Sequence, residues 1–144
     1  MAGAKYGKYV VKEPKGSPMQ PRTTRIQAIS LTGANYASIA ALNMDFNFVG
    51  IVGSHVMGDP PHKHDVDEML FFIPKDPGSA DLGGEVEIAL GEDWEKYTIT
   101  TPGIICLPAG VQHAPLFVKK VKTPFYFGHC LLAPKYSSSE TPAV

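Results

Sequence analysis

Short apolar segments recur along this chain, separated by turns that are rich in glycine and proline, and few of them have helical spacing. Residues 85–90 (EVEIAL) alternate polar and apolar side chains with period 2, the pattern of a half-buried strand. Residues 94–100 (WEKYTIT) follow after the turn-forming stretch 91–93 and predict the partner strand of a hairpin. Many short strands joined by regular turns predict an all-β sandwich or barrel.

The other expected strands are mostly apolar and rich in β-branched residues. They cover residues 22–31, 46–57, 68–73, 104–107, 113–118 and 125–132. Glycines within 46–57 indicate a bend in that strand. The run 104–107 is apolar throughout, so we expect all of it to be buried. The pattern of residues 37–42 (ASIAAL) fits one helical turn or a strand equally well.

A single domain, residues 1–144, is expected, because this length is typical of one domain and suffices for a core without disulfides. Residues 1–21 are expected to form an extended N-terminal arm. The barrel core should cover about residues 46–132, and the polar residues 136–144 should form a mobile tail.

Charge and cysteine content narrow the function classes. The formal net charge is −1, which offers no electrostatic footprint for nucleic acid or an acidic membrane. The N-terminus lacks the apolar core of a secretory signal, and no stretch approaches the roughly 20 apolar residues of a membrane-spanning helix. Cys106 and Cys130 lie in apolar runs and are predicted to be buried free thiols. We therefore expect a cytoplasmic protein that binds neither nucleic acid nor membrane.

The stretch DPPHKHDVDEML contains two of the five histidines of the chain. His62 and His64 are two residues apart, so in a strand they face the same side, with Cα atoms about 6.6 Å apart. Two such imidazoles can converge on one ion with bonds of about 2.0–2.1 Å. Glu68 can join them only if the chain turns at residues 65–67, and aspartate favours turns.

A fourth donor must come from elsewhere in the sequence. His113 follows the turn sequence PAGVQ, far enough after Glu68 for the chain to pass around a barrel and return. Three imidazoles and one carboxylate suit a divalent transition metal such as Fe, Mn, Ni, Co or Zn. A purely structural histidine cluster is the alternative, because an isolated His-x-His pair arises by chance.

At these residues the chain resembles the cupin superfamily, in particular its small single-domain members with one conserved barrel. The first cupin motif, G-x5-H-x-H-x3,4-E-x6-G, corresponds here to GDPPHKHDVDEMLFFIPK, residues 58–75. The second, G-x5-P-x-G-x2-H-x3-N, corresponds to PGIICLPAGVQHAPLF, residues 102–117. The resemblance covers roughly residues 50–132. It implies a double-stranded β-helix, an antiparallel jelly roll, with the metal ligands His62, His64, Glu68 and His113.

The sequence departs from the motifs at turns and strand ends. Gly58 stands four positions before His62 instead of six. Lys75 and Pro102 replace motif glycines, and Phe117 replaces the final asparagine. These departures leave all four ligand positions intact.

The remaining histidines, His55 and His129, are candidate catalytic residues. His55 lies on the strand that leads to the histidine pair, and His129 lies on the closing strand. Either could act as an acid, a base or a substrate anchor, and either could instead be a core or rim histidine. Alternation from Glu68 directs Leu70 and Phe72 inward, which predicts a largely apolar cavity.

These features predict a metal-dependent enzyme that acts on a small organic molecule. The resemblance implies dioxygenase-like chemistry, or isomerase-, decarboxylase- or lyase-like chemistry. A non-catalytic module that binds a small ligand is the alternative, and a structural protein with an adventitious metal site is a third. The resemblance also implies a homodimer with N-terminal strands packed across the interface, which the tyrosines of the arm (Tyr6, Tyr9) would suit.

Overall fold

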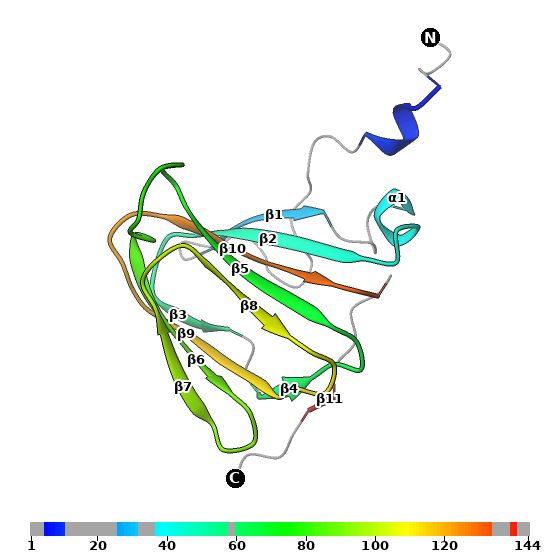
Figure 1. Ribbon diagram of the computed structural model, residues 1–144. Coiled ribbons are helices and arrows are strands. Elements are labelled where there is room, and N and C mark those ends of the chain that lie inside the picture. The colour runs from blue at the N-terminus through cyan, green and yellow to red at the C-terminus, as the bar shows by residue number, and fades with distance from the viewer. Residues whose placement is uncertain (1–4, 11–25, 32–36, 58–59, 134–138, 141–144) are drawn as a thin grey trace.

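Two antiparallel sheets face each other in the computed structural model, which describes residues 5–10, 26–31, 37–57, 60–133 and 139–140 (Figure 1). The first sheet has the order β1 (Ile26–Leu31), β2 (Asp45–Ile51), β10 (Phe125–Leu131), β5 (Glu68–Pro74), β8 (Gly103–Leu107). The second sheet has the order β11 (Ser139–Glu140), β4 (His62–Lys63), β9 (His113–Val121), β6 (Gly84–Leu90), β7 (Glu95–Ile99), with β3 (His55–Met57) also paired to β9.

Most of the expected strands are present. The hairpin predicted from period-2 alternation is β6–β7, in which Val86 pairs with Ile99. The long run 46–57 is divided into β2 and β3, with the bend at residues 52–54 between them. The ambiguous segment 37–42 contains a short helix, α1 (Ala37–Ala40).

The predicted arm and tail are described only in part. In the arm, residues 1–4 and 11–21 lie outside the described residues, and Gly7–Tyr9 forms a 3-10 helix, η1. In the tail, residues 139–140 form β11 and pair with β4, while the remaining tail residues lie outside the described part of the chain. Among the described residues, no helix is both long enough and apolar enough to cross a bilayer.

The hydrophobic core fills the space between the two sheets. Leu70 and Phe72 of β5 are buried, as the alternation from Glu68 predicts. Burial of each large apolar side chain contributes roughly 1.5–3 kcal/mol, so this layer is the main stabilising element. The first sheet contributes Val49, Ile51, Leu70, Phe72, Leu107 and Phe125, and the second contributes Met57, Val86, Ile88, Leu116 and Val118.

The expectation that the whole run 104–107 is buried is wrong. β8 is the edge strand of the first sheet, and its side chains alternate between the two faces. Ile104 is 62% exposed and Leu107 is buried. Cys106 is exposed on the outer face, so the prediction that its thiol is buried is also wrong, and Cys130 is only partly buried.

Candidate metal centre

Strands of both sheets bring the predicted ligands together at one end of the barrel. His62 of β4 and His113 of β9 are Cα partners across the second sheet. His64 follows β4, and a bend at Asp65–Val66 then turns the chain so that Glu68 begins β5 in the first sheet. The turn that the sequence required before Glu68 is therefore present, and both sheets contribute to the cluster.

The three histidines form a compact group. Their ligand nitrogens all lie within 4.8 Å of one another. The ring centroids are 4.4 Å apart for His62 and His113, 5.1 Å for His64 and His113, and 5.2 Å for His62 and His64. His64 and His113 are buried, and His62 is partly exposed. The cluster is thus at the edge of the core, with one ring accessible from outside.

Glu68 lies against this group. Its Oε1 is 3.4 Å from His64 Nε2 and 3.2 Å from His113 Nε2. Neither contact has hydrogen-bond geometry, and Oε1 makes no hydrogen bond to any described residue, although Glu68 is only 5% exposed. A buried carboxylate oxygen without a hydrogen bond is costly, so this position suits a cation.

Backbone carbonyls fix the tautomers of two of the rings. His62 Nδ1 donates to the carbonyl of Pro60 at 3.1 Å, and His113 Nδ1 donates to that of Val111 at 3.1 Å. A carbonyl only accepts, so in the neutral ring the proton is on Nδ1 and the lone pair is on Nε2. Such an outer hydrogen bond orients a histidine for metal ligation. His55, outside the cluster, makes the same type of bond, so the bond alone does not identify a ligand.

The local environment favours the protonation states that ligation requires. Burial, together with the neighbouring His113 and His64, lowers the pKa of His62, although the Pro60 carbonyl opposes this shift. For Glu68, burial alone would raise the pKa, but contacts with three histidines outweigh it and hold the pKa well below its usual range. A neutral imidazole and an ionised carboxylate are the forms that bind metal.

The donors therefore fit a divalent transition metal. Imidazole nitrogens with a carboxylate oxygen form a mixed set of the kind that such ions prefer. Two ligands of one ion lie at most about 4.2 Å apart when each bond is about 2.1 Å. Nitrogens within 4.8 Å of one another need only a small movement of side chains to meet that limit.

His129 is also brought to this end of the barrel, where it bridges two buried carboxylates. Its Nε2 is 3.1 Å from Asp45 Oδ2, and its Nδ1 is 3.2 Å from Glu68 Oε2. Burial alone would lower the pKa of His129, but the two carboxylates raise it to about 9. Sequence analysis missed Asp45, whose signal was a lone acidic residue within the apolar stretch MDFNFVGI.

His55 is not brought to the cluster. It lies on β3 opposite Val118, five residues beyond His113 on β9 and so roughly 16 Å further along that strand. Its Nδ1 bonds to the Gly53 carbonyl at 2.9 Å.

A backbone irregularity adjoins His113. The pairing of β6 with β9 shifts register between Ile88 and Leu90, and Ala114 has φ +78. A positive φ is strained for any residue except glycine. Bulges of this kind redirect side chains near functional sites, and this one lies where β9 presents His113 to the cluster.

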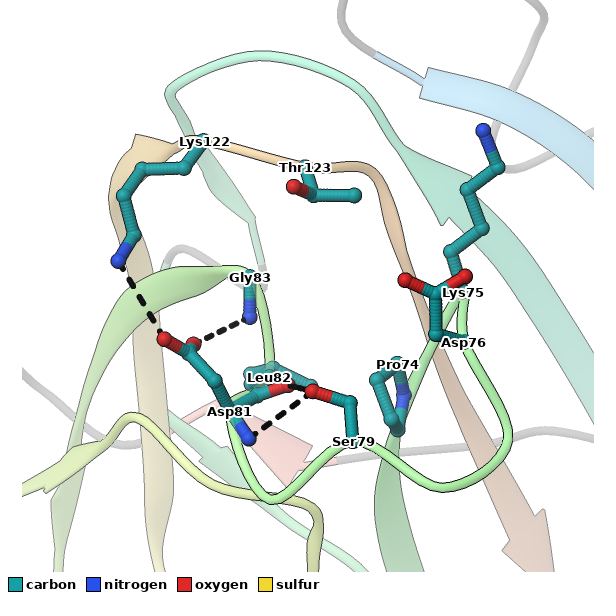
Figure 2. A pocket seen from close by; sticks show the side chains of 9 residues that line it. All are labelled: Pro74, Lys75, Asp76, Ser79, Asp81, Leu82, Gly83, Lys122 and Thr123. Carbon is teal, nitrogen blue, oxygen red and sulfur yellow. Dashed lines mark hydrogen bonds and ion pairs between the residues drawn. The ribbon is translucent and has the colours of Figure 1, made fainter.

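A hollow of about 220 Å³ lies away from the histidine cluster, at the opposite end of the barrel, and Figure 2 shows the residues that line it. Pro74, at the far end of β5 from Glu68, and Lys122, just beyond β9, both line it. Asp81 there accepts a hydrogen bond from Gly83 N at 2.8 Å and pairs with Lys122 Nζ at 3.3 Å. These charges already satisfy one another, and no predicted site residue lines this hollow.

Known proteins resemble this chain in three-dimensional structure, but none of the family models or curated proteins matches it in sequence. Oxalate oxidase in complex with glycolate matches with TM-score 0.61 and 16% identity, over 96% of this chain but only 65% of its own. The polyketide cyclase RemF from Streptomyces resistomycificus matches with TM-score 0.59 and 13% identity, over 92% of this chain and 82% of its own. Lactobacillus farciminis oxalate decarboxylase in a formate complex matches with TM-score 0.52 and 13% identity, over 89% of this chain and 33% of its own.

At these identities the likeness concerns the fold alone. It covers nearly the whole of this chain and less than two thirds of the oxalate oxidase chain. Together with the two facing antiparallel sheets, it confirms the jelly-roll fold predicted from the sequence.

Proposed function

Given that this chain has the jelly-roll fold of the cupins, we propose that it is a metal-dependent enzyme acting on a small organic molecule. Its metal ligands would be His62, His64, Glu68 and His113, holding one divalent transition metal ion such as Fe, Mn, Ni, Co or Zn. The observation that carries this proposal is the buried Glu68 Oε1, which faces two imidazole nitrogens without a hydrogen bond.

Several reaction classes are compatible with the site and its surroundings. A bound ion of this kind acts as a Lewis acid toward an oxygen-bearing substrate or activates dioxygen. Leu70, Phe72 and Leu107 line the interior of the first sheet beyond Glu68, and these apolar side chains would exclude water and leave few polar anchors. We favour dioxygenase-like, isomerase-like, decarboxylase-like or lyase-like chemistry.

Small oxygen-bearing acids are the substrates that we would test first. The oxalate oxidase structure contains glycolate, and the oxalate decarboxylase structure contains formate. Both ligands offer carboxylate oxygens, which are hard donors suited to a divalent ion. We therefore place the substrate among small carboxylic, hydroxy or keto acids.

Elemental analysis of protein purified without added metal tests the site. We expect a stoichiometric transition metal in the wild type and its loss in His62→Ala. The control is His55→Ala, the same substitution at a half-buried histidine outside the cluster. Metal content unchanged in His62→Ala, or lost equally in both variants, would contradict the assignment.

Turnover separates the enzyme from a binding module. Metal-free protein is loaded with Fe²⁺ or Mn²⁺ under anaerobic conditions, mixed with the acid panel, and exposed to oxygen. Product formation that requires His113 supports the enzyme. Tight retention of an acid without any product would instead identify a ligand-binding module.

We also propose that the protein is a homodimer, as the sequence led us to expect. The supporting observation is in the arm, where Tyr6 and Tyr9 stack with ring centroids 6.3 Å apart and are 62% and 65% exposed. Exposed aromatic pairs are typical of surfaces that meet a partner. A monomer mass in solution at micromolar concentration would contradict this proposal.

A further inference from the structure

We propose that His129 and Asp45 are positioning residues that hold Glu68 as a one-oxygen donor aimed at the histidine cluster. This inference rests on the proposed metal-dependent function and assigns roles to two residues outside the ligand set. It also changes the role expected for His129, from an acid or base acting on substrate to a group that acts through Glu68.

Strand register places the three side chains together. Leu131 of β10 pairs with Asp45 of β2 on one side and with Glu68 of β5 on the other. His129 is two residues before Leu131, so its side chain lies on the same face of the sheet. The imidazole therefore stands diagonally between two carboxylates that belong to the two strands flanking its own.

Both ring nitrogens of His129 face carboxylate oxygens. Nε2 is 3.1 Å from Asp45 Oδ2, and Nδ1 is 3.2 Å from Glu68 Oε2. Both ring nitrogens are therefore occupied by carboxylates of the protein, and neither of them faces a substrate.

The two oxygens of Glu68 consequently have different roles. Oε2 is engaged by His129, whereas Oε1 is directed at His64 and His113. Asp45 and Glu68 are 3% and 5% exposed, on strands that are hydrogen-bonded to the same neighbour, β10. The carboxylate is thus oriented before any ion arrives, and outer groups of this kind strengthen metal binding by fixing a ligand.

The test compares Co²⁺ binding to metal-free wild type, His129→Leu and His129→Gln. Affinity is measured by competition with a chelating dye, and the visible spectrum of bound Co²⁺ reports the ligand set. We expect about 10–100-fold weaker binding in His129→Leu with an altered Co²⁺ spectrum. His129→Gln should recover part of the affinity, because its amide N–H can still donate to Glu68 Oε2.

Co²⁺ binding to variants of Asp45 tests the same inference. These variants keep the inference testable if His129→Leu does not fold. Asp45→Asn keeps an acceptor for His129 Nε2 and should bind Co²⁺ more tightly than Asp45→Ala. The matched control is Asp81→Asn, an aspartate in the hollow at the far end of the barrel, which should leave affinity and spectrum unchanged.

The same measurements distinguish failure of this inference from failure of the proposed metal site. Wild-type affinity and spectrum in both His129→Leu and Asp45→Ala would overturn the positioning role and leave the metal site standing. Tighter binding in His129→Leu would overturn it too, because it would mean that the imidazole only repels the ion. A wild type that binds no Co²⁺ at all would overturn both proposals.

Discussion

Substitution of Gly128 by alanine should destabilise the protein strongly, because β10 is closely packed at this residue. Gly128 lies in the middle of β10, paired with Phe48 on β2 and with Phe71 on β5. A Cβ added there would lie 2.7 Å from Phe48 Cβ, and closer still to the carbonyl oxygen of Asn47 and to the tip of the Phe71 ring.

The size of the effect depends on which neighbours can move. The Asn47 carbonyl and Phe48 Cβ are fixed to the backbone of β2, which is hydrogen-bonded to both β1 and β10. The Phe71 ring is stacked on Phe46 at 5.7 Å between centroids, so it also has little freedom. Overpacking costs about 1–3 kcal/mol, and we expect the upper end here. A loss of about 3 kcal/mol corresponds to a decrease in Tm of roughly 6–12 °C for a chain of this length.

Urea unfolding, followed by the fluorescence of Trp94, the single tryptophan, measures the free energy of unfolding. The control is Gly78→Ala in the loop after β5, where an added Cβ would have no atom within 4 Å. It should change stability by no more than about 0.5 kcal/mol. If the free energy of unfolding of Gly128→Ala is also within about 0.5 kcal/mol of the wild-type value, the close packing described for β10 is wrong.

Three further outcomes test the core, the site and a surface ion pair. Phe72→Ala should lower the free energy of unfolding, measured in urea, by about 3–5 kcal/mol, because the ring is fully buried between the sheets. A decrease below about 1 kcal/mol would contradict that placement. Co²⁺ at 100 times its Kd should raise the free energy of unfolding of the wild type by about 2.7 kcal/mol and should also raise its Tm. Neither quantity should change in His113→Ala. Equal increases in both proteins would mean that the ion binds at another site. Lys119 Nζ is 2.8 Å from Glu87 Oε2, and this contact lowers the pKa of Glu87, so it stabilises the fold only while the carboxylate is ionised. Lys119→Met should therefore be slightly less stable than the wild type at pH 7, and the difference should disappear as pH falls through the pKa of Glu87; a difference that grows in acid would refute this account.

Local sequence patterns were informative wherever a feature depends on neighbours along the chain. Alternation in 85–90 predicted a hairpin strand. Alternation from Glu68 along the strand 68–73 directed Leu70 and Phe72 inward. The His-x-His spacing placed His62 and His64 together, because strand geometry relates residues two apart. The separation of His64 from Glu68, four residues, showed that Glu68 needed a turn at 65–67, and the chain bends at 65–66.

Patterns failed where exposure depends on which face of a sheet is covered. Residues 104–107 are all apolar, so no alternation marks which side chains face outward. Ile104 and Cys106 are exposed because they lie on the outer face of the first sheet, where Met69 and Ile73 of the neighbouring strand β5 are exposed as well. Local patterns likewise treated His55 and His129 as equal candidates, although only His129 lies against Glu68.

Residue type and spacing within short segments were enough to predict the β-rich architecture and the candidate ligands. The contact of Asp45 with His129, 84 residues later in the chain, and the contact of His129 with Glu68 are visible only in the folded molecule. The physical reason is that these contacts follow from strand order and register. Both are set by how the two sheets bury their apolar faces, which no local pattern contains.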